Sequence, residues 1–309
     1  CIRDSKDTPQ ESRYALILQA TRQLKDENTD QIMAIFDDAL SVPQEDAGIY
    51  LVKAMLMARH DFPRDEVNAV YRQALAVEPD NEMAQGLLVQ NLAEEERFDE
   101  IVDLCKTSLQ YTPDNQQLCY FEGFSLFQLK RNDEALASLQ KTVELRDEES
   151  DSGMMADCYS LMGEIYREKG MDKACYEAYD SCLHYAPDNV GALNNYAYYL
   201  SLDSAADLQK AEQMSLKAVQ KEPDNATFLD TYAWILFKEK RYDDAKTIAE
   251  RAIASDSTLS SVVVEHCGDI FYMAGDTDRA MEMWQKAAQE DENNAILRRK
   301  IELKKYIEE

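Results

Sequence analysis

One short phrase recurs along the chain at a nearly constant spacing, and it limits the possible folds more than any other feature. The phrase is Pro-Asp-Asn, and it begins at Pro79, Pro113, Pro187 and Pro223. Successive prolines lie 34, 74 and 36 residues apart, and 74 is two periods of 34 plus six. Proline ends a helix, and aspartate or asparagine can cap the helix that follows. A period of this length predicts a series of repeated helical units.

Small residues keep the same period. Gly163 lies twelve residues before Cys175, and Gly268 lies twelve before Ala280. A second small residue often follows seven positions later, as Ala287 follows Ala280. Residues seven apart share one face of a helix, so these positions let two helices approach closely. The larger apolar residues between them are expected to form a core between neighbouring units, because a single helix pair cannot bury its apolar face alone.

The clearest copy of the unit runs from residue 159 to residue 187. It reads Tyr159-x2-Met162-Gly163-x2-Tyr166, then Cys175-x3-Tyr179, then Pro187. This copy resembles the tetratricopeptide repeat (TPR), a helix-turn-helix unit of about 34 residues. The resemblance implies an all-α fold, a right-handed α-solenoid of about eight repeats with a C-terminal capping helix.

Propagating the period along the chain gives the expected boundaries. The repeats are predicted near residues 10–43, 46–79, 82–113, 116–149, 156–187, 190–223, 226–257 and 261–292, which together make an array over 10–292. Six extra residues at 147–153 are expected to lengthen the loop between the fourth and fifth pairs, and the alternative is a hinge between two halves. Two extra residues around 203–207 lengthen the turn inside the sixth pair.

Residues 293–309 are predicted to hold the cap, with a helix over about 294–307. Its apolar residues fall within an arc of about 160° at 100° per residue: Ile296, Leu297, Ile301, Leu303 and Ile307. The basic residues Arg298, Arg299, Lys300, Lys304 and Lys305 lie largely elsewhere. An end cap is expected because the last repeat otherwise exposes its stacking face. The alternative is a basic helix that contacts a membrane.

The charge balance excludes some classes of partner. The 309 residues include 33 Lys and Arg against 60 Asp and Glu, which gives a formal charge of −27. Nucleic acid is not an expected partner, because affinity for phosphate backbones comes mainly from Lys and Arg. With 9 glycines and no Gly-rich phosphate-binding pattern, no nucleotide cofactor is expected. The sequence contains no run of roughly 18 apolar residues, so no membrane span is predicted.

The chain begins at Cys1, and bacterial lipoproteins begin with a lipid-carrying cysteine once the signal peptide has been cut. We therefore expect Cys1 to be a lipidation site and residues 1–9 to be a tether. The stretch from Tyr196 to Leu236 also resembles the repeats of bacterial envelope lipoproteins. That resemblance implies a protein held at the periplasmic face of the outer membrane, with membrane contact only through the lipid. The alternative is a cytoplasmic protein whose sequence starts at an arbitrary boundary.

Catalytic and metal-binding patterns are weak. The three histidines, His60, His184 and His266, fall in three different repeats. His266 with Glu265 and Asp269 is the only local cluster that resembles a site, and we interpret it as solvated surface or partner contact rather than as metal ligands. The cysteines beyond Cys1 fall at packing positions and predict buried thiols. No catalytic residue, metal or cofactor is therefore expected, and an unrecognised hydrolase site is the third-ranked alternative.

In TPR arrays the first helix of each pair lines the concave face, and the resemblance implies that this face binds the partner. The matching positions are Gln117, Tyr120, Phe124, Phe127, Glu164, Arg167, Glu168, Asn194, Tyr198, Asp230, Trp234, Phe237, Glu265, Asp269 and Tyr272. Aromatic anchors dominate binding energy at interfaces, although some of these rings can instead belong to the core between repeats.

The charge of these positions restricts the partner. Family members that bind chaperones grip a C-terminal carboxylate with Lys, Arg and Asn, whereas this chain retains Asn194 beside Glu164, Asp230 and Glu265. An acidic tail would be repelled, so an apolar or basic segment, or another helical protein, is favoured. The sequence thus predicts a non-enzymatic adaptor that binds a protein or peptide, and the alternative is a cytosolic co-chaperone or assembly scaffold.

Overall fold

The computed structural model describes residues 29–203, 207–256, 258–291 and 293–308, together with Ala15, Ile17 and Arg22. Within this part of the chain there are sixteen α-helices and no strand. The chain divides into two compact units between Met154 and Met155. We call residues up to Met154 unit 1 and the rest unit 2. The predicted all-α repeat fold is confirmed.

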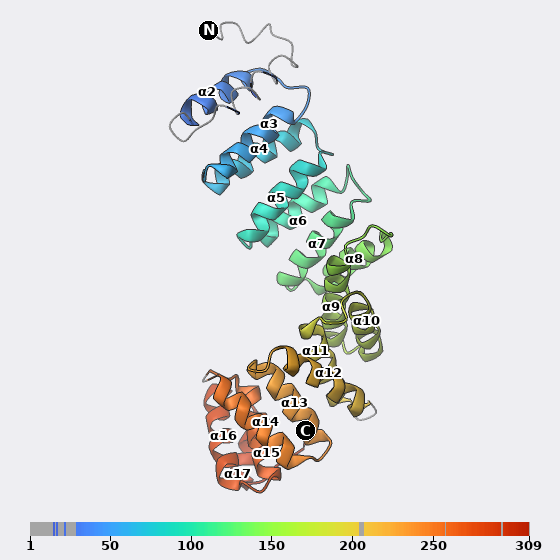
Figure 1. Ribbon diagram of the computed structural model, residues 1–309, viewed down its shortest axis with the longest axis vertical. Helices are drawn as coiled ribbons and strands as arrows, with labels where there is room; N and C mark the ends of the chain where they lie inside the picture. The colour runs from blue at the N-terminus through green and yellow to red at the C-terminus, as the bar shows by residue number, and fades with distance from the viewer. Residues whose placement is uncertain are drawn as a thin grey trace. The chain divides into compact units, whose positions relative to one another are not determined.

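Unit 1 is built from consecutive helices that lie side by side (Figure 1). They are α2 (Thr29–Ala39), α3 (Gly48–Arg59), α4 (Arg64–Val77), α5 (Glu82–Glu94), α6 (Phe98–Ser108), α7 (Gln116–Gln128) and α8 (Asn132–Glu144). We call α3, α5 and α7 first helices and α4, α6 and α8 second helices, because each odd-numbered helix opens a pair. The core of the unit extends from Ile17 through α2 to α7.

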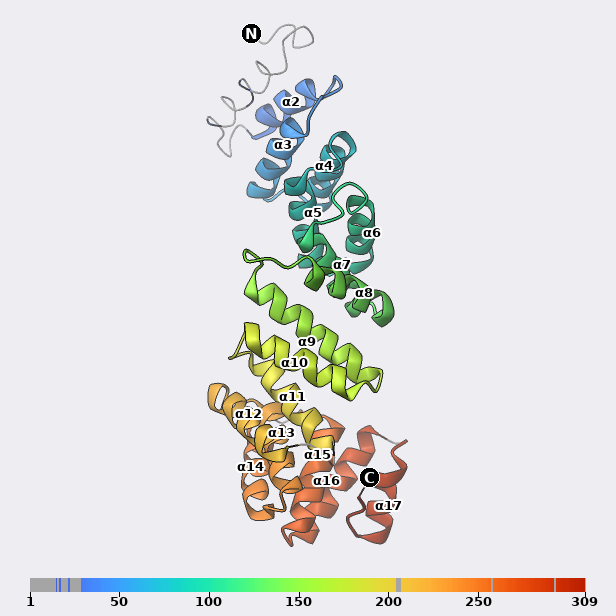
Figure 2. The same ribbon diagram turned by 90° about the vertical axis from the view of Figure 1, so that its right-hand side faces the viewer.

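Unit 2 continues the same alternation (Figure 2). It holds α9 (Ser152–Glu168), which begins just before the division, α10 (Asp172–Tyr185), α11 (Val190–Leu202), α12 (Leu208–Lys221), α13 (Ala226–Lys238), α14 (Tyr242–Ser255), α15 (Ser261–Met273), α16 (Thr277–Glu290) and α17 (Ala295–Leu303). The odd-numbered helices from α9 to α15 are its first helices. Neighbouring first helices α11, α13 and α15 pack directly on one another.

The recurring asparagine caps a first helix each time, as its place in the phrase predicts. The side chains of Asn81, Asn115, Asn189 and Asn225 accept hydrogen bonds from backbone N–H groups in the first turns of α5, α7, α11 and α13. Asn294 does the same for α17, at 2.9 Å from the N–H of Leu297. Each cap satisfies a backbone donor that the helix itself cannot bond.

The start of the fifth pair differs from the prediction. The fifth pair was expected from residue 156, but α9 begins at Ser152. The backbone N–H of Met154 donates to Asp151 Oδ1 at 2.7 Å, so the acidic segment caps a longer helix instead of only lengthening a loop. The segment at 147–153 ends just before the division between the two units. Residues 10–14, 16, 18–21 and 23–28 of the first predicted pair, and residues 204–206, lie outside the described residues.

Close packing within the pairs depends on particular glycines. A Cβ atom built on Gly268 would lie 2.4 Å from Cδ1 of Trp284, whereas one built on Gly86 would meet no atom within 4 Å. Both glycines lie inside first helices, where alanine is intrinsically favoured by about 1 kcal/mol. The close contact of Trp284 with the backbone at Gly268 therefore decides whether alanine at position 268 stabilises or destabilises the protein.

We expect Gly268→Ala to destabilise the protein by about 1–3 kcal/mol, because the ring of Trp284 must move within a packed core. Gly86→Ala should leave stability unchanged or raise it by up to about 1 kcal/mol. Urea denaturation followed by circular dichroism measures both. Equal effects of the two substitutions would show that the contact with Trp284 is not limiting.

Candidate functional site

The first-helix face of unit 2 carries most of the predicted binding residues, and the structure buries six of them. Asp230, Trp234 and Phe237 on α13 are 6%, 7% and 5% exposed, and Glu265 and Asp269 on α15 are 8% and 2% exposed. Asn194 on α11 is also buried, whereas Tyr198 and Tyr272 are half-buried. The structure therefore brings these side chains together, but beneath other side chains.

One group of these residues centres on His266. Its Nδ1 lies 3.0 and 3.2 Å from the two carboxylate oxygens of Asp230. The imidazole also stacks on Trp234 with ring centroids 4.0 Å apart, and Trp234 stacks on Phe237 at 4.9 Å. A carboxylate on one side and an indole face on the other both favour an imidazolium. This group links α13 to α15.

A second group is built around Lys300 of α17. Its Nζ donates to Glu265 Oε1 and to Asp269 Oδ2, each at 2.7 Å, and the side chain is 1% exposed. Trp284 Nε1 donates to the other oxygen of Asp269 at 2.9 Å, and Asn294 Nδ2 donates to the other oxygen of Glu265 at 2.9 Å. Both carboxylates are therefore held on two sides.

The chain's last residues complete this arrangement. We call residues 294–308 the C-terminal segment. Tyr306 packs edge-on against Phe237, with ring centroids 5.6 Å apart, and Lys300 Nζ lies 5.6 Å from the centre of the Tyr306 ring. The segment thus contacts α13 through Tyr306 and α15 through Lys300. It occupies part of the face where a partner was predicted to bind.

Three predictions from the sequence are corrected by the structure of α15 and α17. The cluster of Glu265, His266 and Asp269 was expected on solvated surface or at a partner contact, but all three side chains are buried within the chain, because Lys300 and Asp230 supply their counter-charges. Lys300 itself was placed largely away from the apolar face of the last helix, but it is buried one turn from Leu297. The helix also ends at Leu303 rather than near residue 307, since Lys304 adopts a left-handed conformation with φ of 52°.

The paired charges around His266 predict how stability depends on pH. Burial alone would lower the pKa of His266, but Asp230, together with Asp269 and Glu265, outweighs burial and raises it. A raised pKa in the folded state contributes stability below the unfolded value of about 6.5 and loses it as the pH rises through the folded value.

We therefore expect the free energy of unfolding to fall as the pH rises above about 6.5, by about 1.4 kcal/mol for each pH unit that separates the two pKa values. His266→Gln should remove this part of the decline. His184, which is exposed on α10, is the matched control. Chemical denaturation at several pH values measures the slope, and equal slopes for wild type and His266→Gln would contradict the pairing.

The first-helix face of unit 1 is more open. A pocket of about 270 Å³ lies between α5 and α7 and is lined by Glu82, Gly86, Val89, Asn115, Gln116, Gln117, Leu118 and Phe121. Gln117 in this lining is exposed. Met83, which follows Glu82 in α5, is 58% exposed. Tyr120 and Phe124 are half-buried, with their ring centroids 6.2 Å apart. Phe127 is buried at 9% exposure and is covered by Lys130.

Comparison with solved structures identifies the fold. A tetratricopeptide repeat protein from Parabacteroides merdae matches with a TM-score of 0.55 and 13% identity, over 84% of this chain and 98% of that one. YrrB, a TPR protein with an unusual peptide-binding site, matches with a TM-score of 0.52 and 11% identity, over 60% of this chain and 92% of that one. The chain has the tetratricopeptide-repeat fold. No family model matches the sequence, and no curated protein matches it.

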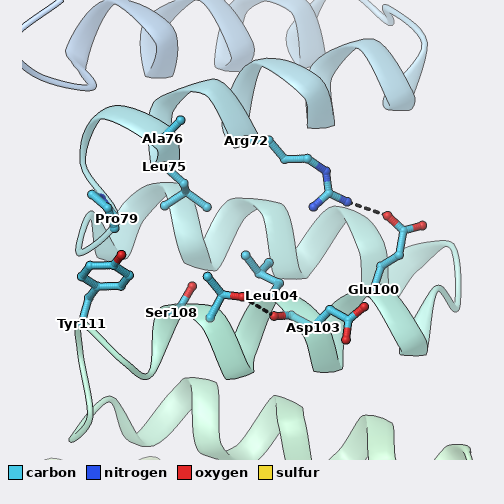
Figure 3. Close-up of a pocket in the computed structure, with 10 residues that line it drawn as sticks. Arg72, Leu75, Ala76, Pro79, Glu100, Asp103, Leu104, Ser108 and Tyr111 are labelled. Carbon is cyan, nitrogen blue, oxygen red and sulfur yellow. Dashed lines mark hydrogen bonds and ion pairs between the residues drawn. The ribbon is translucent and has the colours of Figure 1, made fainter.

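A second hollow of this TPR array lies on the second helices of unit 1 (Figure 3). Its volume is about 440 Å³. Leu75 of α4 and Leu104 of α6 face one another across it, and Tyr111, which is 55% exposed, stands at one end. At the other end Arg72 and Glu100 form an ion pair at 2.5 Å. This hollow was not predicted, because its lining comes from two helices on the face opposite to the expected groove positions.

The cysteines of the TPR array are packing residues, as predicted. Cys105, Cys119, Cys158, Cys175, Cys182 and Cys267 are all buried. Burial raises the pKa of Cys175 and of Cys182 to about 11. Thiols with such pKa values are protonated and unreactive at neutral pH. Cys1 lies outside the described residues.

The described residues hold no candidate metal site and no candidate membrane span. No group of three or more His, Cys, Asp and Glu side chains in this part of the chain could hold a metal ion. None of the described helices is long and apolar enough to cross a membrane.

Proposed function

We propose that this TPR array is a non-enzymatic scaffold that binds a protein or peptide segment on the first-helix face of unit 1. The observation that carries the proposal is the open pocket between α5 and α7, with Gln117 exposed in its lining and Met83 exposed on α5. Exposed apolar side chains beside half-buried rings are typical of interaction surfaces. Peptide binding by YrrB, which shares the fold, supports the same class of function.

The charge of the chain favours an apolar or basic segment. Glu82 lines the pocket, and the whole chain carries a formal charge of −27. Complementary charge speeds encounter and disfavours acidic partners. The partner we expect is therefore an extended or helical segment with apolar side chains flanked by Lys or Arg.

The test compares variants on the two faces of unit 1. Gly86→Leu fills the pocket where a new Cβ meets no atom, and Tyr120→Ala removes an aromatic contact. Each should weaken the binding of a co-purified partner by about 1–3 kcal/mol, as truncation of an interface anchor does. Isothermal titration calorimetry measures the affinity.

Tyr111→Ala is the matched control, since it removes an exposed aromatic ring from the hollow between α4 and α6. It should leave the affinity unchanged. Loss of binding in Tyr111→Ala alone would move the binding site to the second helices. Unchanged binding in all three variants would remove the proposal for unit 1.

We also propose that the array is held at the periplasmic face of the outer membrane by a lipid on Cys1, with a cytoplasmic scaffold as the alternative. The support is that the stretch from Tyr196 to Leu236 resembles the repeats of bacterial envelope lipoproteins. Mass spectrometry of the protein from its native host should find a lipid mass on Cys1, and Cys1→Ser in the full precursor should release the protein from membranes. An unmodified Cys1 would favour the cytoplasmic alternative.

A further inference from the structure

The buried Lys300 is an unusual residue for a capping helix. Leu297 and Lys300 are the buried residues of α17. A cap that only covers the last repeat needs apolar side chains, and an apolar residue at a buried ion pair is often as stabilising as the pair itself. A lysine that is 1% exposed is instead tolerated only where charges fit it closely. Position 300 therefore has the properties of a recognition contact.

The receptor for this lysine is formed by α15. Glu265 and Asp269 lie four residues apart, so their carboxylates project from one face of the helix. Trp284 holds one oxygen of Asp269, and the remaining oxygen accepts from Lys300 at 2.7 Å. The two oxygens of Glu265 accept from Lys300 and from Asn294, which both belong to the C-terminal segment. Two carboxylates at this spacing form a site for a primary ammonium group.

An aromatic contact accompanies the ammonium site. Tyr306, six residues after Lys300, packs against Phe237, which in turn stacks on Trp234. The Nε1 of Trp234 is buried and has no hydrogen-bond partner among the described residues. The C-terminal segment thus fills the ammonium site but leaves the buried Trp234 Nε1 beside the aromatic contact without an acceptor in the described part of the chain. A buried donor without an acceptor is unfavourable in a protein core.

The helix of the C-terminal segment is short. α17 has nine residues, and helices of this length are marginal on their own. Leu303, its last residue, is 57% exposed. The segment is tethered directly to α16, so its high local concentration favours the bound state without requiring strong intrinsic affinity.

We propose that the first-helix face of α13 and α15 is a second binding site, specific for a segment that carries a lysine and a nearby aromatic ring, and that the chain's own C-terminal segment is its resident, displaceable occupant. A partner segment of the same chemistry gains access by replacing Lys300 and Tyr306. The proposal rests on the function as an interaction scaffold but concerns unit 2, so it stands or falls separately from the site on unit 1.

The experiment uses the full chain with a protease recognition sequence inserted after Asp291, in the connection between α16 and α17. The probe is a fluorescent synthetic peptide of residues 293–308. We expect no binding to the uncut protein and saturable binding to the cut protein, measured by fluorescence anisotropy. The same peptide with Lys300→Ala should bind about 30-fold more weakly, as expected when one partner of a buried charge pair is removed.

The peptide with Arg299→Ala is the matched control, since Arg299 is exposed on the same helix, and it should bind like the unmodified peptide. Gly86→Leu in unit 1 should also leave peptide binding unchanged. Equal binding of the Lys300→Ala and Arg299→Ala peptides would overturn the ammonium site. Failure of the cut protein to exchange its segment, or a loss of helical circular dichroism larger than the nine residues of α17 account for when the segment leaves, would show a purely structural cap and overturn the proposal.

Discussion

Replacing Trp234 by alanine is expected to destabilise the protein by about 3–5 kcal/mol, the usual cost of truncating a large ring in a core. The ring is 7% exposed and lies between His266, at 4.0 Å, and Phe237, at 4.9 Å. Removing it leaves a cavity and also takes away one face of the environment that favours the imidazolium of His266. Urea denaturation followed by circular dichroism measures the loss.

Val262→Ala is the control for Trp234→Ala, because Val262 is 53% exposed on the neighbouring helix α15. Its effect should stay within about 0.5 kcal/mol, as for other surface substitutions. A small effect of Trp234→Ala on stability, together with a large loss of partner affinity, would show that the ring is an accessible anchor, as the sequence pattern alone predicts.

Replacing Lys300 by alanine is expected to cost about 3–5 kcal/mol, because it leaves two buried carboxylates without their cation. Burial alone would lower the pKa of Lys300, but Asp269 and Glu265 outweigh burial and raise it, so the ammonium is present at neutral pH. The loss should appear as faster hydrogen exchange in α15 and α17 and as a lower midpoint of urea denaturation.

Arg299→Ala removes an exposed charge from the same helix and should change stability by less than about 0.5 kcal/mol. A triple variant with Lys300→Met, Glu265→Gln and Asp269→Asn should recover much of the lost stability, because no buried charge is then left unpaired. If Lys300→Ala and Arg299→Ala have the same small effect, the buried ion pair does not hold the C-terminal segment in solution.

The repeated helix pairs are predictable because their signals are local. Each asparagine of the Pro-Asp-Asn phrase bonds backbone groups within three residues of itself, so the sequence carries the whole interaction. Gly268 and Trp284 are also close in sequence, and their contact follows from the pairing of adjacent helices. The face of each first helix is predictable for the same reason.

The burial of the predicted binding residues on α13 and α15 could not be predicted from these local signals. Asp230 contacts His266 from 36 positions away, and Lys300 contacts Glu265 from 35 positions away. Helical periodicity places a lysine on the polar side of a helix, whereas its burial here depends on carboxylates from another repeat. The groove positions of α13 and α15 include the acids Asp230, Glu265 and Asp269 and no Lys or Arg. This pattern in the sequence is a signal that their counter-charges come from elsewhere in the chain.

Site-specific photo-crosslinking shows which face of unit 1 a partner binds. A photoreactive residue is placed at Gln117, which is exposed in the pocket between α5 and α7, or at Thr107, which is exposed in the hollow between α4 and α6. If partners bind the first-helix face, we expect a discrete covalent adduct with a partner polypeptide from position 117, abolished by Gly86→Leu, and none from position 107. Adducts from position 107 with none from position 117 would contradict binding at this face.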